Sequence, residues 1–94
     1  MMKHEFKKIV SVKVISPSTL ELEFACGTWR RVDLSPVMVG SLFGELKNPE
    51  IFSQVFLDVE VGTVCWPNGA DFDPDTLFNW DEAVHELSQQ LQSA

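Results

Sequence analysis

The sequence has no tyrosine, only two cysteines and two histidines, and half as many basic as acidic residues. Cys26 and Cys65 stand far apart and form no CxxC pair, so we expect free thiols in a reducing compartment. His4 and His85 share no ligand-pair spacing with each other or with the cysteines. We therefore expect neither a metal site nor a cofactor.

Long apolar segments are also missing. No run approaches the roughly 20 residues that cross a bilayer. No uninterrupted apolar stretch of the signal-peptide type follows the charged residues 3–8. We expect a cytoplasmic protein that does not act at a membrane. The net charge of -7 argues against direct binding of nucleic acid, because phosphate backbones favour clustered Lys and Arg. A basic protein partner fits this charge better.

Motifs of catalysis are absent as well, since the sequence contains neither a Gly-rich phosphate loop nor a nucleophile elbow. We expect no enzyme activity. Asp71, Asp73, Asp75 and Glu82 follow the ligand spacing of a calcium loop, but Thr76 stands where the loop needs glycine. We interpret Asp73 as a helix cap and expect no calcium binding.

What the sequence does contain is period-two alternation of apolar and polar residues, typical of half-buried strands. It covers residues 10–14, 20–24 and 29–34, separated by turn residues, and it returns at 55–59 and 63–66 with Gly62 between the last two. The pattern predicts a hairpin, a third strand and a second hairpin, joined in one antiparallel sheet.

Serine or asparagine followed by proline indicates helix starts between these strands. Ser35-Pro36 predicts a short helix over residues 37–43, and Asn48-Pro49 predicts another turn of helix. The expected fold class is α+β: a small antiparallel sheet of two hairpins plus a third strand, short central helices, and a C-terminal helix that covers one face.

The tail is the clearest periodic segment. Leu77, Trp80, Val84, Leu87 and Leu91 are spaced three and four residues apart, which places them along one stripe of a helix. We divide the chain into a domain of residues 1–78 and an amphipathic helix of residues 79–94 that packs on that domain or on a partner. Trp80, Val84, Leu87 and Leu91 are the predicted partner-binding residues, and a homodimer is one possible outcome.

A second candidate lies at the end of the last strand, where Trp66, Asn68, Gly69 and Asp71 follow one another closely. Asn68-Gly69 is typical of a turn with positive φ. This segment is either an exposed recognition loop or a structural turn that leads the chain into its final helices. The pattern favours the structural interpretation.

The run Trp-Pro-Asn-Gly-Ala-Asp at residues 66–71 is the most specific of several segments that resemble the bacterial family called domain of unknown function 2442. The other segments are residues 10–24, 27–34, 43–46, 48–52 and 63–65, and the resemblance ends near residue 78. It implies a compact α+β domain found alone, ahead of a helix-turn-helix, or encoded beside another small protein in what look like toxin–antitoxin pairs. It implies no established activity and assigns no catalytic residues.

Three functions stay open. The first is a binding module, antitoxin-like or an adaptor, that binds a protein partner, with a small basic protein as one candidate. The second is a transcription-linked regulator without its own DNA-binding domain, which needs a basic patch from Lys3, Lys7, Lys8, Arg30 and Arg31. The third is a small enzyme, which needs a pocket that combines the cysteines, histidines and aspartates.

Overall fold

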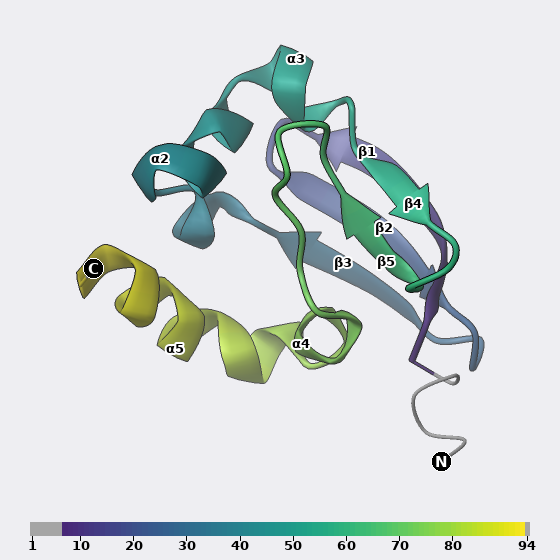
Figure 1. The fold of residues 1–94 in the computed structure, drawn as a ribbon. Coiled ribbons are helices and arrows are strands. Elements are labelled where there is room, and N and C mark those ends of the chain that lie inside the picture. The colour runs from purple at the N-terminus through teal and green to yellow at the C-terminus, as the bar shows by residue number, and fades with distance from the viewer. Residues whose placement is uncertain (1–6, 94) are drawn as a thin grey trace.

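The computed structural model describes residues 7–93, and its first element is a three-stranded antiparallel sheet (Figure 1). The strands are β1 (Ile9–Ser16), β2 (Thr19–Phe24) and β3 (Trp29–Asp33), in the order β1-β2-β3. Leu20, Leu22 and Phe24 of β2 are buried, while the alternating Glu21 and Glu23 are only half-buried. The predicted alternation is thus confirmed in β2, and it gives this sheet one apolar and one polar face. In β1 the register shift after Ile9 leaves Val10 49% exposed, although Val12 and Val14 pack against the core as predicted.

The second hairpin forms a separate sheet rather than joining the first, so the single sheet that we expected is divided in two. Its strands β4 (Phe56–Asp58) and β5 (Thr63–Cys65) have three residues each. One hydrogen bond of 2.8 Å, from Ile9 N to Gly62 O, joins β1 to the turn between them. The register of β1 shifts between Ile9 and Ser11, and a shift of this kind locally disrupts a ladder.

Short helical segments connect the two sheets, but the continuous helix expected over residues 37–43 is wrong. The segments are η1 (Ser35–Val37), α2 (Gly40–Phe43), η2 (Gly44–Lys47) and α3 (Pro49–Phe52). Val39 is extended and Gly40 has a φ of 82°, a left-handed conformation that glycine adopts readily, so the helix breaks there. The Asn48 side chain accepts from Glu50 N, which confirms the predicted start of α3.

Two helices end the chain where the periodic stripe predicted one. They are α4 (Pro74–Phe78) and α5 (Trp80–Ser93), and the Asp73 side chain caps α4 by accepting from Thr76 N. Asn79 interrupts them with φ -104° and ψ 36°, and its side chain donates to the Asp75 carbonyl. Leu77 therefore belongs to a different helix from the rest of the stripe.

The core lies between the apolar face of the first sheet, the second hairpin and the helices. Trp66 is at its centre, in ring contact with Phe52 and Phe72, and Phe72 in turn contacts Trp80. The fold class is the expected α+β. Among the described residues, no helix combines the length and apolar content needed to cross a bilayer.

Candidate functional site

The predicted recognition loop is held against the body of the protein. Trp66 is buried, and its Nε1 donates to Phe52 O at 2.9 Å. Asn68 bonds through Nδ2 to Glu45 Oε1 at 2.7 Å and accepts through Oδ1 from Ala70 N. Gly69 has a φ of 96°, as the turn signal predicted, and Asp71 is exposed. These contacts give three of the four residues a structural task, and a role in recognition stays a prediction.

The predicted partner-binding stripe begins inside the protein. Trp80 is buried, and Val84 and Leu87 are half-buried against the core. The side chain of Leu91 lies outside the described residues. Contact of the distal stripe with another chain therefore stays a prediction.

Residues with possible metal or redox chemistry are dispersed. Cys26 is exposed, Cys65 is half-buried, and both are free thiols. His85 is exposed and lies 3.1 Å from the Gln89 amide, while His4 is outside the described residues. Among residues 7–93, no three His, Cys, Asp or Glu side chains are grouped so that they could hold a metal ion.

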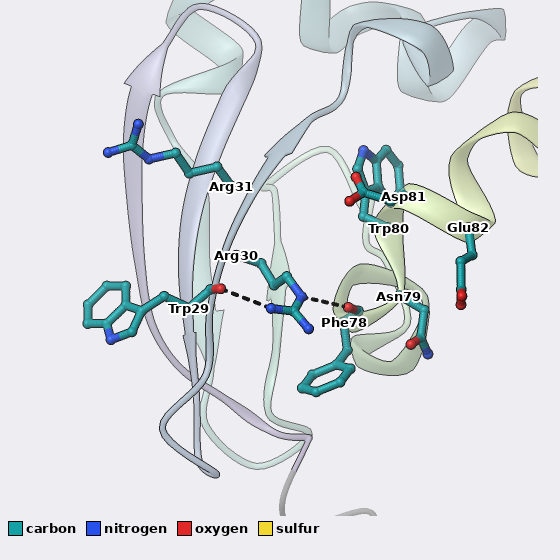
Figure 2. A pocket seen from close by; sticks show the side chains of 8 residues that line it. All are labelled: Trp29, Arg30, Arg31, Phe78, Asn79, Trp80, Asp81 and Glu82. Carbon is teal, nitrogen blue, oxygen red and sulfur yellow. Dashed lines mark hydrogen bonds between the residues drawn. The ribbon is translucent and has the colours of Figure 1, made fainter.

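The described residues form a concave feature that we did not predict. It is a hollow of about 380 Å³ between β3 and the junction of α4 and α5, which we call the β3 groove (Figure 2). Its strand wall consists of Trp29, Arg30 and Arg31. Its helix wall consists of Phe78, Asn79, Trp80, Asp81 and Glu82.

The strand wall carries the outer edge of a sheet, because β3 has β2 on one side only. Leu34 N bonds to Ser18 O at 2.7 Å and Phe24 N bonds to Thr28 O at 2.9 Å, so even-numbered residues of this segment exchange hydrogen bonds with β2. The odd-numbered Trp29, Arg31 and Asp33 therefore direct their N–H and C=O groups to the free edge.

Two of these outward carbonyls have partners from the groove itself. Trp29 O accepts from Arg30 Nη1 at 3.2 Å, and Asp33 O accepts from Trp80 Nε1 at 3.1 Å. The N–H and C=O of Arg31, between them, have no hydrogen-bond partner among residues 7–93. The middle of the edge is thus open.

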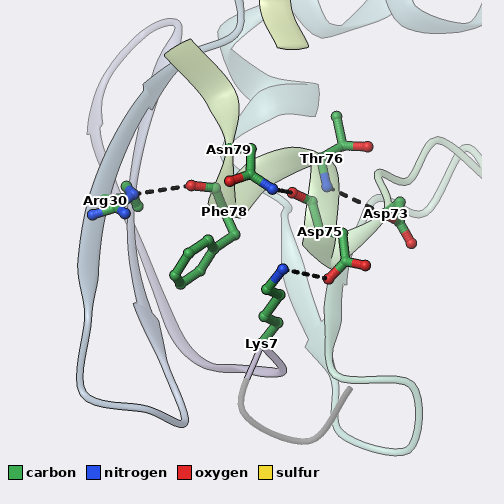
Figure 3. A network of polar contacts seen from close by, with 7 residues as sticks. All are labelled: Lys7, Arg30, Asp73, Asp75, Thr76, Phe78 and Asn79. Atoms are coloured by element: carbon green, nitrogen blue, oxygen red, sulfur yellow. Dashed lines mark hydrogen bonds and ion pairs between the residues drawn. The ribbon is translucent and has the colours of Figure 1, made fainter. Parts of the chain in front are cut away.

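The two walls are fastened together at Phe78. Arg30 Nε donates to Phe78 O at 3.0 Å, and its guanidinium lies 4.8 Å from the centre of the Phe78 ring. Lys7 Nζ lies 5.3 Å from the same ring and 3.9 Å from the Asp75 carboxylate (Figure 3). Phe78 also meets Phe24 edge to face at 5.0 Å. These contacts hold α4 against the sheet and set the position of the helix wall.

Charge is distributed unevenly over the groove. Asp81 and Glu82 are exposed on the helix wall, and neither carboxylate has a partner within the described residues. Arg31 pairs with Glu21 at 3.2 Å on the polar face of the sheet, and Arg30 is bound to the backbone. Trp29 is 53% exposed at the other side of the strand. The groove therefore combines an open strand edge with two unpaired carboxylates, and the exposed indole of Trp29 lies on the opposite face of the same strand.

Comparison with known proteins agrees with the resemblance seen in the sequence. The family model described as protein of unknown function (DUF2442) matches residues 9–83, so the chain belongs to this family. The match extends past the expected end at residue 78 and includes both walls of the β3 groove. No curated protein and no solved structure gives a significant match.

Proposed function

We propose that this member of the DUF2442 family is a binding module for a protein partner, and that the partner docks in the β3 groove. The observation that carries the proposal is the open edge of β3, with the exposed indole of Trp29 on the outer face of that strand and the unpaired Asp81 and Glu82 across the groove. Tryptophan and arginine are the residues most enriched among those that dominate binding energy at protein interfaces. An arginine already held in place, as Arg30 is, loses little side-chain entropy when a partner arrives.

A basic partner fits the groove and the whole chain. The net charge is -7, and the two carboxylates of the helix wall are free to meet cationic side chains. Opposite charge on the two proteins speeds their encounter and disfavours wrong partners. An antitoxin-like or adaptor role, in which the chain neutralises or positions a small basic protein, is the form of the proposal that this charge supports best.

The transcription-linked alternative receives less support from the arrangement of basic residues. Lys7 is near Asp75, Arg30 is bound to Phe78 O, and Arg31 pairs with Glu21. The methylene groups of Lys8 lie against Gly62, and Lys3 is outside the described residues. Positive charge that is already paired gains less from phosphate contacts.

The test is co-expression of the chain with the proteins encoded by its neighbouring reading frames, followed by size-exclusion chromatography with light scattering. We expect a complex with a small basic protein, and its Kd to rise about tenfold or more in Trp29→Ala. The matched control is Phe56→Ala, because Phe56 is an aromatic residue 47% exposed on β4, away from the groove. Equal weakening by the two variants, or no effect of Trp29→Ala, would overturn the proposed docking site.

A further inference from the structure

We infer that the partner binds by strand addition: an extended segment with basic side chains pairs with the free edge of β3 inside the β3 groove. This inference rests on the proposed function and specifies the form in which the partner docks. The ligand is a strand from another protein, and its side chains alternate between basic and apolar residues. Three features support strand addition: the unpaired backbone of Arg31, the occupied carbonyls at the two ends of the edge, and the charge of the helix wall.

The backbone of β3 offers what an added strand needs. The N–H and C=O of Arg31 point away from β2 and are unpaired among the described residues. An exposed edge with unpaired groups is a template for another strand, and several peptide-binding domains use it in this way. The five residues of β3 give an edge about 17 Å long, enough for a strand of about five residues.

The carbonyl groups at the two ends of the edge already have partners, which favours pairing of the added strand at its middle. Trp80 Nε1 occupies the Asp33 carbonyl, and Arg30 Nη1 occupies the Trp29 carbonyl. The incoming backbone is thus directed to Arg31. The two blocking groups thus stand at the ends of β3 and leave the backbone at its middle accessible.

The walls determine which side chains the added strand carries. Neighbouring side chains of a strand point to opposite faces of the sheet. Figure 2 shows Arg30 directed toward Phe78 and the helix wall, and Trp29 and Arg31 directed to the other side of β3. Alternate side chains of the ligand therefore face the unpaired Asp81 and Glu82, where Lys or Arg is favoured, and the others lie beside the Trp29 indole, where apolar side chains are favoured.

A second copy of this chain fits the edge less well. Antiparallel pairing of two β3 strands about their centres would place Arg31 directly opposite Arg31, and like charges in that position destabilise a sheet. Each copy would also bring its own -7 charge and its own Asp81 and Glu82 to the contact. A basic strand from another protein meets neither penalty.

The experiment uses the full chain and a labelled synthetic peptide of about seven residues that alternates lysine and valine. Fluorescence anisotropy measures its Kd for wild type, for Arg31→Pro and for the matched control Arg31→Ala. Proline at residue 31 removes the outward N–H but no hydrogen bond to β2, because Arg31 belongs to a non-hydrogen-bonded pair. We expect Arg31→Pro to weaken binding about tenfold or more and Arg31→Ala to change it by less than about threefold.

A second measurement keeps the inference testable if Arg31→Pro does not fold. In wild type, hydrogen exchange of the Arg31 amide should slow when the peptide is added, and a peptide N-methylated at alternate nitrogens should lose this effect. Equal binding by the two Arg31 variants, unchanged exchange of the Arg31 amide, or undisturbed binding of the N-methylated peptide would each overturn strand addition. Self-association of wild type that Arg31→Pro abolishes would also overturn it, in favour of a second copy. The Trp29→Ala test with the natural partner decides the proposed function separately.

Discussion

The indole Nε1 of Trp80 donates a hydrogen bond of 3.1 Å to the main-chain carbonyl of Asp33. The two residues are 47 positions apart in the sequence, and the bond joins the first residue of α5 to the last residue of β3. It closes one end of the strand edge and at the same time holds the helix that carries Asp81 and Glu82. The geometry of the β3 groove thus depends on a residue that the sequence pattern placed on the apolar stripe and assigned to partner binding.

Trp80→Phe separates the hydrogen bond from the packing of the ring. The smaller aromatic ring keeps much of the contact with Phe72 but leaves the Asp33 carbonyl without this donor. We expect the free energy of unfolding to fall by about 1–3 kcal/mol, and by about 3–5 kcal/mol in Trp80→Ala, which also leaves a cavity. Urea denaturation followed by circular dichroism measures both. Equal stability of Trp80→Phe and wild type would show that the bond contributes nothing.

Asp33 gives the protein a defined response to acid. A hydrogen bond from Ser35 N to Asp33 Oδ1 at 3.0 Å holds the pKa of the Asp33 carboxyl below its ordinary value. Because the pKa is lower in the folded than in the unfolded state, the carboxylate contributes stability above the unfolded pKa and loses it as the pH falls through the folded pKa. We expect Asp33→Asn to be less stable than wild type near pH 7, and the difference to shrink toward about pH 3. A difference that stays constant over this range contradicts the assignment.

The two thiols should differ in reactivity. A hydrogen bond with the Thr28 hydroxyl lowers the pKa of the exposed Cys26, whereas burial, and then the charges of Asp71 and Asp58, raise the pKa of Cys65. Since the thiolate is the nucleophile, iodoacetamide should modify Cys26 first. Peptide mapping by mass spectrometry reads out the order, and Thr28→Val should slow the reaction of Cys26 but not that of Cys65. Faster labelling of Cys65 in wild type would contradict both pKa assignments.

Calcium and zinc should leave the melting temperature unchanged. Two of the four carboxylates that follow the calcium-loop spacing have other partners: Asp73 caps α4, and Asp75 lies 3.9 Å from Lys7 Nζ. A native-state ligand at 100 times its Kd would add about 2.7 kcal/mol to stability, an effect that a thermal shift assay detects readily. A saturable rise in melting temperature with either ion, absent after Asp73→Asn, would disprove the prediction.

The sequence correctly predicted features that depend on residues close together in the chain. The period-two strands and the caps Asn48 and Asp73 each depend on residues within a few positions of one another. The prediction of one helix over residues 37–43 was wrong because Gly40 adopts a left-handed φ, which the apolar residues around it do not reveal. The single sheet failed because whether two hairpins join depends on contacts between segments far apart in the sequence, such as the bond from Ile9 N to Gly62 O, which no local pattern encodes.

The β3 groove could not be predicted for a related reason. Its walls are joined by a contact between Arg30 and Phe78, 48 residues apart, and its open edge exists only because β3 is last in the strand order. Arg30 and Arg31 were noticed in the sequence as candidates for a basic patch. In the structure, Arg30 holds α4 against the sheet through Phe78, and Arg31 presents its backbone at the free edge of β3. The positive charge of the two residues predicts neither role.

The last prediction concerns the distal part of the C-terminal stripe. Leu87 is half-buried against the core, and α5 runs beside η1. Monomeric proteins rarely expose a continuous strip of apolar side chains, so we expect the distal leucines of α5 to contact another chain. We expect Leu87→Asp with Leu91→Asp to abolish self-association or partner binding while the domain stays folded, as measured by sedimentation and circular dichroism. Leu42→Asp, on an exposed leucine of α2, is the matched control and should change neither quantity. If wild type sediments as a monomer and the double variant unfolds, the stripe belongs to the core and the predicted interface is wrong.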